Sequence, residues 1–368
     1  MKLSCEREKL LGAFQMVASV VPARSPKAVL QNVKLEAEDE QATLVATDLE
    51  LGIRMELQGV ELEQPGSVLL PSTRVGMILR ETPEEKLHLA SEGSRIRIWG
   101  QRSEFFLPSE NPEEYPDLPE FEGDTWHQIS ARVFREMIRR TVFATDPEST
   151  RYALGGVFIE AGDDQITAVA TDGRRLALQT GPAKLGTVPA PGNTIIPTRT
   201  MQLLERALAD NEGDIQVAVR ENVIQVKSQR LLVESRLVEG RFPRWRDVFP
   251  RSEPRMTVEL SVGPFLSAVR QSAIVTSENH RGVDFTFGDG KVVLLAEGAE
   301  FGEARVEMPV AYDAQQVQIT LDPRYLIEFL RVLEPEKTFT LCIRTPESPV
   351  VCSTDDGYRY LLMPLTRN

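Results

Sequence analysis

Arginine side chains recur on one face of several predicted helices, at spacings of three, four or seven residues. In residues 131–142, Arg132, Arg135 and Arg139 fall within roughly 60° of one another on a helical wheel of about 100° per residue. The apolar residues of this stretch fall on the opposite side, where a sheet would cover them. A guanidinium group pairs with a phosphate through two parallel hydrogen bonds. This row of arginines therefore indicates contact with a phosphate backbone.

Two further predicted helices repeat this pattern. The helix expected to begin at Arg199 carries Arg206 on the same face, and the helix expected to begin at Arg324 carries Arg331. Any amphipathic surface helix exposes charges to water, so one such helix alone says little. Equivalent helices in one acidic chain favour binding of phosphates without recognition of bases. Because aromatic residues are not interleaved with these arginines, duplex DNA is favoured over single strands.

Residues typical of catalytic or metal sites are sparse. The three histidines, His88, His127 and His280, lie far apart in the sequence, and no zinc-protease, nucleophile-elbow or nucleotide-loop motif occurs. The sequence therefore predicts no catalytic residue, no metal site and no cofactor. A hydrolase that pairs Asp172 with a second carboxylate is an alternative, which measurable turnover would support.

The elements that must position these side chains occur three times along the chain. Each unit opens with a strand and a helix, and a second strand-and-helix segment follows later: VLLPSTRVGMILRET, TIIPTRTMQLLERAL and ITLDPRYLIEFLRVLE. A period of about 125 residues indicates tandem domains rather than a short solenoid repeat. We expect an α+β fold with domains at residues 1–124, 125–250 and 251–368.

The composition is that of an acidic globular chain. Its 368 residues carry a net charge of −13, with −10 in residues 1–124, +2 in residues 125–250 and −5 in residues 251–368. An acidic protein can still bind DNA where its basic residues gather on one surface. No apolar run is long enough to span a membrane, and no signal-peptide pattern opens the sequence. Three scattered cysteines suit a reducing cytoplasm rather than a disulfide framework.

One short segment is more specific than the rest. Residues 170–177 read ATDGRRLA, and the corresponding place in the first repeat reads ATDLE. Asp172-Gly173 is typical of a two-residue turn between paired strands. A simple hairpin turn is the plainest interpretation of this segment.

Several motifs in a fixed order nevertheless carry a resemblance. With ATDGRRLA they are Arg151-Tyr152, Gly240 to Pro243, Asn279 to Val283 and Tyr360 to Leu365. From Met1 to the C-terminus the chain closely resembles the bacterial DNA polymerase III beta subunit, the sliding clamp family. The resemblance implies three tandem domains of the DNA-clamp fold, each with two helices packed on antiparallel sheets. It also implies a head-to-tail dimeric ring around duplex DNA, whose helices line the hole.

The resemblance implies a hydrophobic cleft between domains two and three that receives a short peptide from partner proteins. Leu, Val and Met side chains there would bury aliphatic anchors of the peptide. Family members often carry histidine where Arg174 stands and arginine where Asp247 stands, so the polar rim differs here. The implied cleft residues are Thr171, Gly173, Arg174, Arg175, Leu176, Pro243, Val248, Leu361, Met363, Pro364 and Leu365.

Two other residue sets follow from the resemblance together with the arginine pattern. The expected DNA-facing residues are Arg24, Arg80, Arg132, Arg135, Arg139, Arg151, Tyr152, Arg199, Arg206 and Arg331. The expected dimer contacts are Phe105, Phe106, Ile274 and Val275.

The implied function is that of a non-catalytic processivity factor. The implied partners are a second copy of the chain, sequence-independent double-stranded DNA, the DNA polymerase III alpha subunit and an ATP-driven clamp loader. Translesion polymerases, ligase and mismatch-repair proteins are further implied partners, and the implied location is the cytoplasm, at the nucleoid during replication. An adaptor array that binds peptides without closing into a ring is an alternative, and a dimeric mass in solution would argue against it.

Overall fold

The computed structural model describes all residues except 122–126, 150–152, 187–193, 279, 299–300 and 366–368. Arg151 and Tyr152, two of the predicted DNA-facing residues, lie outside the described residues. Contacts divide the chain into two compact units. One comprises Met1–Arg132, Ala183–Pro191 and Gln202–Leu237, and the other comprises Val133–Pro182, Gly192–Met201 and Val238–Asn368.

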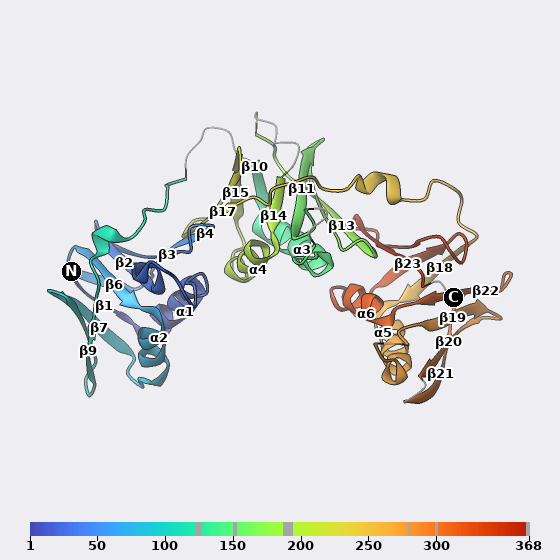
Figure 1. Cartoon of the computed structure of the whole chain (residues 1–368), viewed down its shortest axis with the longest axis horizontal. Coiled ribbons are helices and arrows are strands. Elements are labelled where there is room, and N and C mark those ends of the chain that lie inside the picture. The colour runs from blue at the N-terminus through green and yellow to red at the C-terminus, as the bar shows by residue number, and fades with distance from the viewer. Residues whose placement is uncertain (122–126, 150–152, 187–193, 279, 299–300, 366–368) are drawn as a thin grey trace. The chain divides into compact units, whose positions relative to one another are not determined.

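The predicted strand-and-helix segments are confirmed in all three repeats (Figure 1). The opening segments are β1 (Lys2–Glu6) with α1 (Arg7–Ala18), β10 (His127–Ser130) with α3 (Ala131–Thr141), and β18 (Met256–Ser261) with α5 (Val262–Ser272). The later segments are β6 (Gly66–Pro71) with α2 (Ser72–Glu81), β14 (Thr194–Pro197) with α4 (Thr198–Ala207), and β22 (Val317–Leu321) with α6 (Pro323–Arg331). Short 3-10 turns are η1 (Ala28–Gln31), η2 (Pro112–Glu114), η3 (Val142–Ala144), η4 (Trp245–Val248) and η5 (Ala273–Val275).

The first unit contains a five-stranded and an eight-stranded antiparallel sheet. The five-stranded sheet has the order β5-β1-β7-β8-β9, with β5 (Val60–Gln64), β7 (Lys86–Glu92), β8 (Arg95–Trp99) and β9 (Glu104–Pro108). The eight-stranded sheet has the order β10-β15-β16-β17-β4-β3-β2-β6, with β15 (Asp214–Arg220), β16 (Val223–Lys227), β17 (Leu231–Arg236), β4 (Leu51–Glu56), β3 (Gln41–Thr47) and β2 (Asn32–Glu38).

The second unit contains an eight-stranded and a four-stranded antiparallel sheet. The larger has the order β14-β11-β12-β13-β25-β24-β23-β18, with β11 (Gly156–Gly162), β12 (Gln165–Thr171), β13 (Arg175–Pro182), β25 (Tyr358–Leu362), β24 (Val350–Ser353) and β23 (Thr338–Ile343). The smaller has the order β21-β20-β19-β22, with β21 (Gly302–Pro309), β20 (Lys291–Gly298) and β19 (Val283–Gly288).

Each eight-stranded sheet continues from one repeat into the next. In the first joint, β17 of repeat two pairs with β4 of repeat one, and Val233 lies opposite Ile53. In the second joint, β25 of repeat three pairs with β13 of repeat two, and Tyr360 lies opposite Ala177. Continuous backbone pairing across a repeat boundary explains why the contact units do not follow the sequence repeats.

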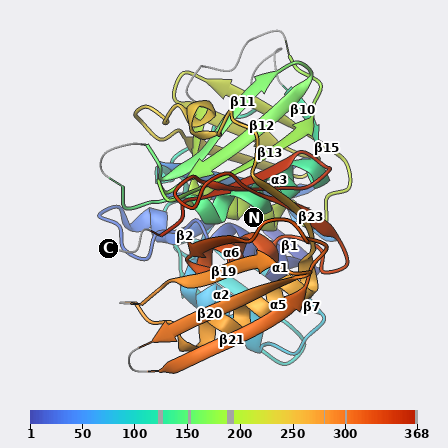
Figure 2. The same ribbon diagram turned by 90° about the vertical axis from the view of Figure 1, so that its right-hand side faces the viewer.

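Apolar helix faces pack in pairs under the strands. In the first unit α1 lies beside α2 and packs on β3, and in the second unit α5 lies beside α6 and packs on β20 and β21 (Figure 2). Asp322 caps α6 by accepting a hydrogen bond from the Arg324 N–H, and Pro323 occupies the first turn, so this helix begins where its sequence signals predict. No helix of the described chain is long and apolar enough to cross a membrane.

Candidate functional site

The turn between β12 and β13 is held by one of its own side chains. Asp172 Oδ1 accepts hydrogen bonds from the N–H groups of Arg174 (2.9 Å) and Arg175 (3.0 Å). The last paired residues are Thr171 and Leu176, so the prediction of a two-residue turn is wrong. The loop is longer because an aspartate that caps two backbone N–H groups stabilises the wider bend.

Gly173 lies at the exposed tip of this turn. Its φ of 84° is in the left-handed region, which glycine adopts without a steric cost. Its N–H donates a hydrogen bond to Thr171 Oγ1 at 3.1 Å. Gly173 and Arg174 are exposed, so both are accessible to a partner beside the turn.

Arg175 is buried beneath the turn rather than displayed on its rim, with 7% of the residue exposed. Its guanidinium binds Asp172 Oδ2 at 3.0 Å, the Glu328 carboxylate of α6 and the Phe143 carbonyl at 2.7 Å. The guanidinium also lies 4.6 Å from the centre of the Tyr325 ring. Removing one partner of a buried charge is costly, so Arg175 fixes the turn against α6 and η3.

The surroundings of Arg175 keep its guanidinium protonated. Burial works to lower the pKa of the guanidinium, but neighbouring Tyr360 and Glu328 act in the opposite direction and Asp172 adds to them. The net result is a raised pKa. Arg175 is therefore a fixed cation that links the turn to repeat three at every relevant pH.

The chain after β25 lies against this turn. Met363 N–H donates to the Arg174 carbonyl at 2.9 Å, which continues the β13–β25 ladder by one bond. Leu365 N–H donates to the Thr320 carbonyl at 2.9 Å. These two bonds leave the Met363 and Leu365 side chains 41% and 37% exposed, a high value for large apolar groups. The backbone therefore presents two apolar side chains beside the turn.

Leucine and phenylalanine side chains form a buried apolar layer at the second joint. Leu176 and Leu361 face each other across the second joint, and each is 3% exposed. They belong to one cluster with Phe158 and Phe242, against which Trp245 packs. Exposed apolar residues lie on the two segments that supply Leu361 and Trp245 to this layer, and together they indicate a binding surface. We call Leu176, Val248, Leu361, Met363 and Leu365 the tail patch.

Val248, Pro243 and Pro364 are the remaining residues of the predicted cleft. Val248 ends η4 and is 46% exposed, and η4 begins at Trp245, which packs on the buried layer. Pro243 and Pro364 are half-buried. All of the predicted cleft residues belong to one contact unit, although they span the sequence from Thr171 to Leu365.

The first joint has the same strand pairing but lacks this apolar layer. Gly52 and Glu234 face each other where the second joint has Leu176 and Leu361. A Cβ added to Gly52 would overlap the Leu118 side chain, which fills that space. A desolvated apolar pocket cannot accommodate a carboxylate such as Glu234. The first joint is therefore unsuited to binding apolar peptide anchors.

The described members of the predicted DNA-facing set are exposed. In α3, Arg135 and Arg139 are exposed while Phe134, Met137 and Ile138 are at most 1% exposed. The predicted two-faced helices are thereby confirmed, and the same division holds in α4 and α6. The exposed residues are Arg24, Arg80, Arg132, Arg135, Arg139, Arg199, Arg206 and Arg331.

The predicted dimer contacts include two strongly exposed apolar side chains. Ile274 in η5 is 76% exposed and Phe106 in β9 is 47% exposed. Phe105 and Val275 are half-buried. The Phe106 ring lies beneath the guanidinium groups of Arg95 and Arg97, 5.5 and 5.9 Å from its centre, so of the two side chains Ile274 is the more available for a contact.

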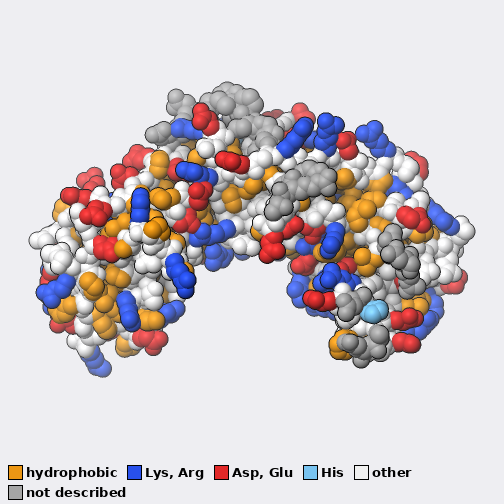
Figure 3. All heavy atoms as spheres, in the orientation of Figure 1, with side chains coloured by type: hydrophobic (Ala, Val, Ile, Leu, Met, Phe, Trp, Pro, Cys, Tyr) orange, Lys and Arg blue, Asp and Glu red, His pale blue; other side chains and the backbone are white. Residues whose placement is uncertain are grey.

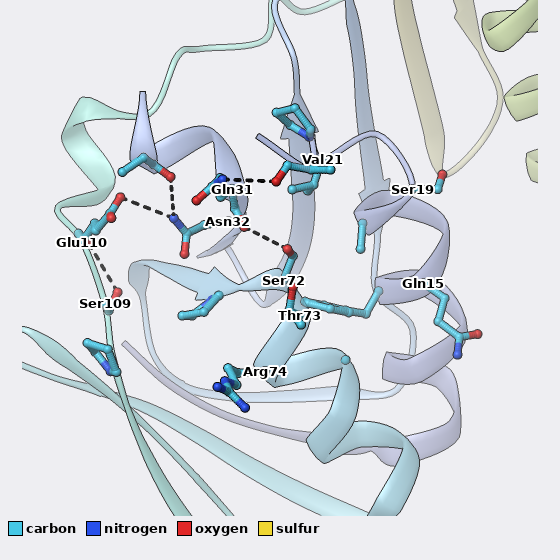
Figure 4. Close-up of a pocket in the computed structure, with 18 of the residues that line it drawn as sticks. Gln15, Ser19, Val21, Gln31, Asn32, Ser72, Thr73, Arg74, Ser109 and Glu110 are labelled. Carbon is cyan, nitrogen blue, oxygen red and sulfur yellow. Dashed lines mark hydrogen bonds between the residues drawn. The ribbon is translucent and has the colours of Figure 1, made fainter. Parts of the chain in front are cut away.

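Sequence reasoning missed a pocket of about 890 Å³ in repeat one (Figure 4). It lies among the chain after α1, the start of α2 and the segment after β9, and Arg74 is one of the residues that line it. Asn32 Nδ2 donates to the Ala28 and Val29 carbonyls and to Glu110, and Ser72 donates to the Gln31 carbonyl at 2.8 Å. Asn32, Ser72 and Glu110 thus already take part in intrachain hydrogen bonds, which no local sequence signal predicts.

Charged groups are spread over the surface, with basic and acidic side chains intermixed in the view of Figure 3. Across the part of the chain that the structure describes, no three His, Cys, Asp or Glu side chains are grouped so that they could hold a metal ion. The arrangement offers binding surfaces: exposed guanidinium groups for phosphates and an apolar patch for a peptide.

Repeats of paired helices under antiparallel sheets, joined edge to edge by their strands, define a DNA clamp. Three family models of the DNA polymerase III beta subunit match this chain. The N-terminal domain model matches residues 1–119, the central domain model residues 128–244 and the C-terminal domain model residues 246–366. The beta sliding clamp of Caulobacter vibrioides is 30% identical, over 99% of this chain and 100% of that protein. The beta sliding clamp of Escherichia coli K12 is 26% identical, over 99% of this chain and 100% of that protein.

Solved structures agree with these relatives. The DNA polymerase III subunit beta of Pseudomonas aeruginosa superposes with a TM-score of 0.90 at 27% identity, covering 100% of both chains. A sliding clamp of the same organism bound to griselimycin gives 0.91 at 27% identity and the same coverage. The chain belongs to the bacterial DNA polymerase III beta subunit family, the beta sliding clamps, and comprises three clamp domains.

Replacing Arg175 with methionine should weaken binding of a clamp-binding peptide about tenfold, although Arg175 itself is buried. The loss of its charge leaves Asp172 and Glu328 without their shared partner, so the turn shifts relative to α6. Calorimetry with the peptide measures the affinity. Arg174→Ala, at the exposed rim, should change affinity about threefold or less. Unchanged affinity in Arg175→Met would contradict the positioning role.

Proposed function

We propose that two copies of this chain close head to tail into a ring that encircles duplex DNA and holds the replicative polymerase on its template. The observation that carries this proposal is the recurrence of exposed arginines on the helices of every repeat, opposite their buried faces. Phosphate contacts of this kind have no preferred position along the duplex, so a ring can slide while it remains linked to DNA.

The experiment that tests the proposal compares circular with linear DNA. After loading, the protein should stay on nicked circular DNA through gel filtration and should be lost from the same DNA once it is cut. A ring held by topology gives this difference, whereas ordinary affinity gives none. Equal retention on both DNAs would refute the ring.

Reversing the charge of Arg135 and Arg139 to glutamate should lower loading and processive synthesis at least tenfold, while the dimer persists. Both side chains are exposed on one face of α3, so the change replaces two attractive phosphate contacts with repulsion. Primer extension on a long template measures processivity. The matched control reverses Arg251 and Arg255, which are exposed outside the helices. Equal losses in both variants would indicate a general charge effect instead.

The tail patch is the proposed docking site for a short peptide of partner proteins. Its exposed Val248, Met363 and Leu365 can take up aliphatic and aromatic anchors, and methionine adapts to anchors of different shape. The proposed partners are the DNA polymerase III alpha subunit, an ATP-driven clamp loader, translesion polymerases, ligase and mismatch-repair proteins. The family assignment and the apolar surface beside the turn support this set.

We further propose domain limits at residues 1–124, 125–250 and 251–368, a non-catalytic role and action in the cytoplasm at the nucleoid. Phe105 or Phe106 of one copy would meet Ile274 and Val275 of the other at each joint of the ring. The mass in solution should be near twice 41.2 kDa. A monomer at micromolar concentration would instead favour an adaptor that binds peptides without closing.

A further inference from the structure

The second joint has one face toward α3 and α6 and one face away from them. Tyr358 donates a hydrogen bond to the Arg140 carbonyl of α3 at 2.8 Å, and Arg175 binds the Glu328 carboxylate of α6, so these side chains lie on the helix face. Successive side chains of a strand alternate between the two faces of its sheet. The residues adjacent to Tyr358 and Arg175 along β25 and β13 therefore lie on the outer face.

This outer face carries a row of three residue pairs with a charge at each end. Along β25 and its continuation, the pairs are Arg359 with Leu178, Leu361 with Leu176, and Met363 with Arg174. The three leucines are buried, whereas both arginines are exposed. The apolar centre of the row thus has a guanidinium group on either side.

Arg359 is available for a carboxylate from a partner. It lies two residues before Leu361 in β25 and makes no ion pair with any residue that the structure describes. Asp356, which lies three residues earlier in the chain, is bound instead by Arg140 at 2.9 Å. A carboxylate that binds Arg359 therefore breaks no ion pair within the described chain.

Arg174 is available at the other end of the row. Its guanidinium hydrogen-bonds the Tyr325 side chain, and this contact, together with nearby Asp172 and Asp322, raises the pKa of Arg174. The neutral phenol leaves the charge of Arg174 uncompensated. Both carboxylates are bound to other arginines, Asp172 at 3.0 Å and Asp322 at 2.6 Å. Arg174 can therefore bind a carboxylate from a partner.

The segment between repeats two and three adds a third cation beside the same apolar residues. Phe242 and Trp245 of this segment pack in the buried apolar layer of the joint. Arg244 lies between them, is exposed, and makes no ion pair among the described residues. Asp247, the carboxylate that follows on this segment, lies 3.9 Å from Arg251. Arg244 thus adds attraction for an acidic segment.

The arginines of the first joint are used differently. Arg236 stands at the end of that joint and pairs with Glu50 at 3.7 Å. Arg54 lies opposite Leu232 and donates a hydrogen bond to the Leu118 carbonyl at 3.2 Å. These two guanidinium groups are already bound within the chain, so the second joint is the one suited to an acidic segment.

We propose that the tail patch selects peptides whose apolar anchors are flanked by carboxylates on both sides, one bound by Arg359 and the other by Arg174. This inference rests on the proposed docking site and adds the chemistry of the partner segments. Four residues of extended chain separate Arg359 from Met363, a span of about 13 Å at about 3.3 Å per residue. Acidic side chains about four residues apart in an extended peptide can therefore reach both guanidinium groups.

The centre of the row favours a peptide over a nucleic acid. Leu176 and Leu361 are aliphatic, whereas the bases of a single strand stack on aromatic rings. A carboxylate matches the two parallel N–H groups of a guanidinium. Because the chain has a net charge of −13, exposed cations around one apolar site attract an acidic segment that the average surface repels.

Matched peptides test the charges. Each probe is a short labelled peptide with leucine and phenylalanine as anchors, and it carries either aspartate or asparagine on both sides of them. Fluorescence anisotropy at about 50 mM salt should show that the unmodified protein binds the aspartate peptide about tenfold more tightly. The preference should fall below about twofold at about 500 mM salt, because salt screens exposed charge pairs. Equal affinities at low salt would overturn the inference.

Neutral variants test the two arginines. Arg359→Gln and Arg174→Gln should each weaken binding of the aspartate peptide about threefold and leave binding of the asparagine peptide unchanged. Both side chains are exposed, so the melting temperature should not change. The matched control Arg270→Gln, exposed on α5, should change neither affinity. Equal losses for both peptides would indicate a structural effect and overturn the charge role.

Charge reversal assigns each arginine to one end of the peptide. Two further probes carry lysine in place of one aspartate, on the amino-terminal or on the carboxyl-terminal side of the anchors. Arg359→Glu should bind one of these probes more tightly than the aspartate peptide, and Arg174→Glu should prefer the other. A preference of both variants for the same probe, or for neither, would overturn the assignment.

The outcomes separate this inference from the docking site itself. If the unmodified protein binds neither the aspartate nor the asparagine peptide, the proposed docking site fails first. Binding of both with equal affinity would leave the site in place and overturn only the role of the charges. Displacement of the aspartate peptide by a single-stranded oligonucleotide at the same concentration would show a general site for polyanions, and would also overturn the inference.

Discussion

Replacing Leu176 with aspartate will abolish binding of a clamp-binding peptide while the protein remains dimeric. Leu176 is 3% exposed and faces Leu361 across the second joint, in the buried part of the tail patch. A carboxylate there enters a desolvated apolar layer, and anchors in such pockets usually contribute about 2 kcal/mol or more each. Calorimetry should therefore show at least a roughly 30-fold loss of affinity, since about 1.4 kcal/mol corresponds to tenfold.

Three companion variants separate lost binding from lost folding. Leu176→Met keeps an apolar side chain of similar volume and should bind within about threefold of the unmodified protein. The double variant Met363→Ala with Leu365→Ala changes exposed side chains only, so it should fold normally and still bind poorly. Deletion of residues 363–368 should abolish binding of polymerase and clamp loader without dissociating the dimer. Full affinity in the deleted protein would refute the peptide site, although the ring would stand.

Replacing Ile274 with alanine and Val275 with lysine will convert the dimer to monomers. Ile274 is 76% exposed on a single chain, so a partner that covers it gains apolar burial, and a lysine beside it adds a charge to the contact. We expect dissociation to be favoured about 100-fold or more, and processive synthesis should be lost with the ring. Sedimentation at micromolar concentration measures the change.

Val275 is half-buried and its carbonyl lies close to Gly298, so the double variant could disturb η5 as well. The single variant Ile274→Lys changes a group that is already exposed and should fold with an unchanged melting temperature. It should still dissociate, because the charge would be desolvated in the dimer. A dimer that survives Ile274→Lys would contradict the assignment of this contact.

The local sequence was sufficient to place the helices and their two faces. Apolar residues at three- and four-residue spacing predict the buried sides of α3, α4 and α6, and the structure buries Phe134, Met201 and Phe329 as this spacing requires. The strand-and-helix segments were equally predictable, since each opens with an alternating strand and continues into a helical period. These features depend on neighbours within one or two turns.

The turn at Asp172 shows where local reasoning failed. An Asp-Gly pair predicts a two-residue turn, but the bend is wider because Asp172 bonds two N–H groups and also reaches Arg175. The Arg175 side chain is in turn held by Glu328, which lies 153 residues away in the sequence. No periodicity around residue 175 could reveal that its guanidinium points inward.

The sequence by itself determined the three repeats, the amphipathic helices and the arginine-bearing faces, because these follow from side-chain period and composition along a continuous segment. Only the tertiary structure decided how the sheets join, why Leu176 meets Leu361 while Gly52 meets Glu234, and which strand edges stay open. Strand pairing joins residues that are far apart in the chain. Its partner and register depend on which edges meet in space, and one chain segment does not encode that choice alone.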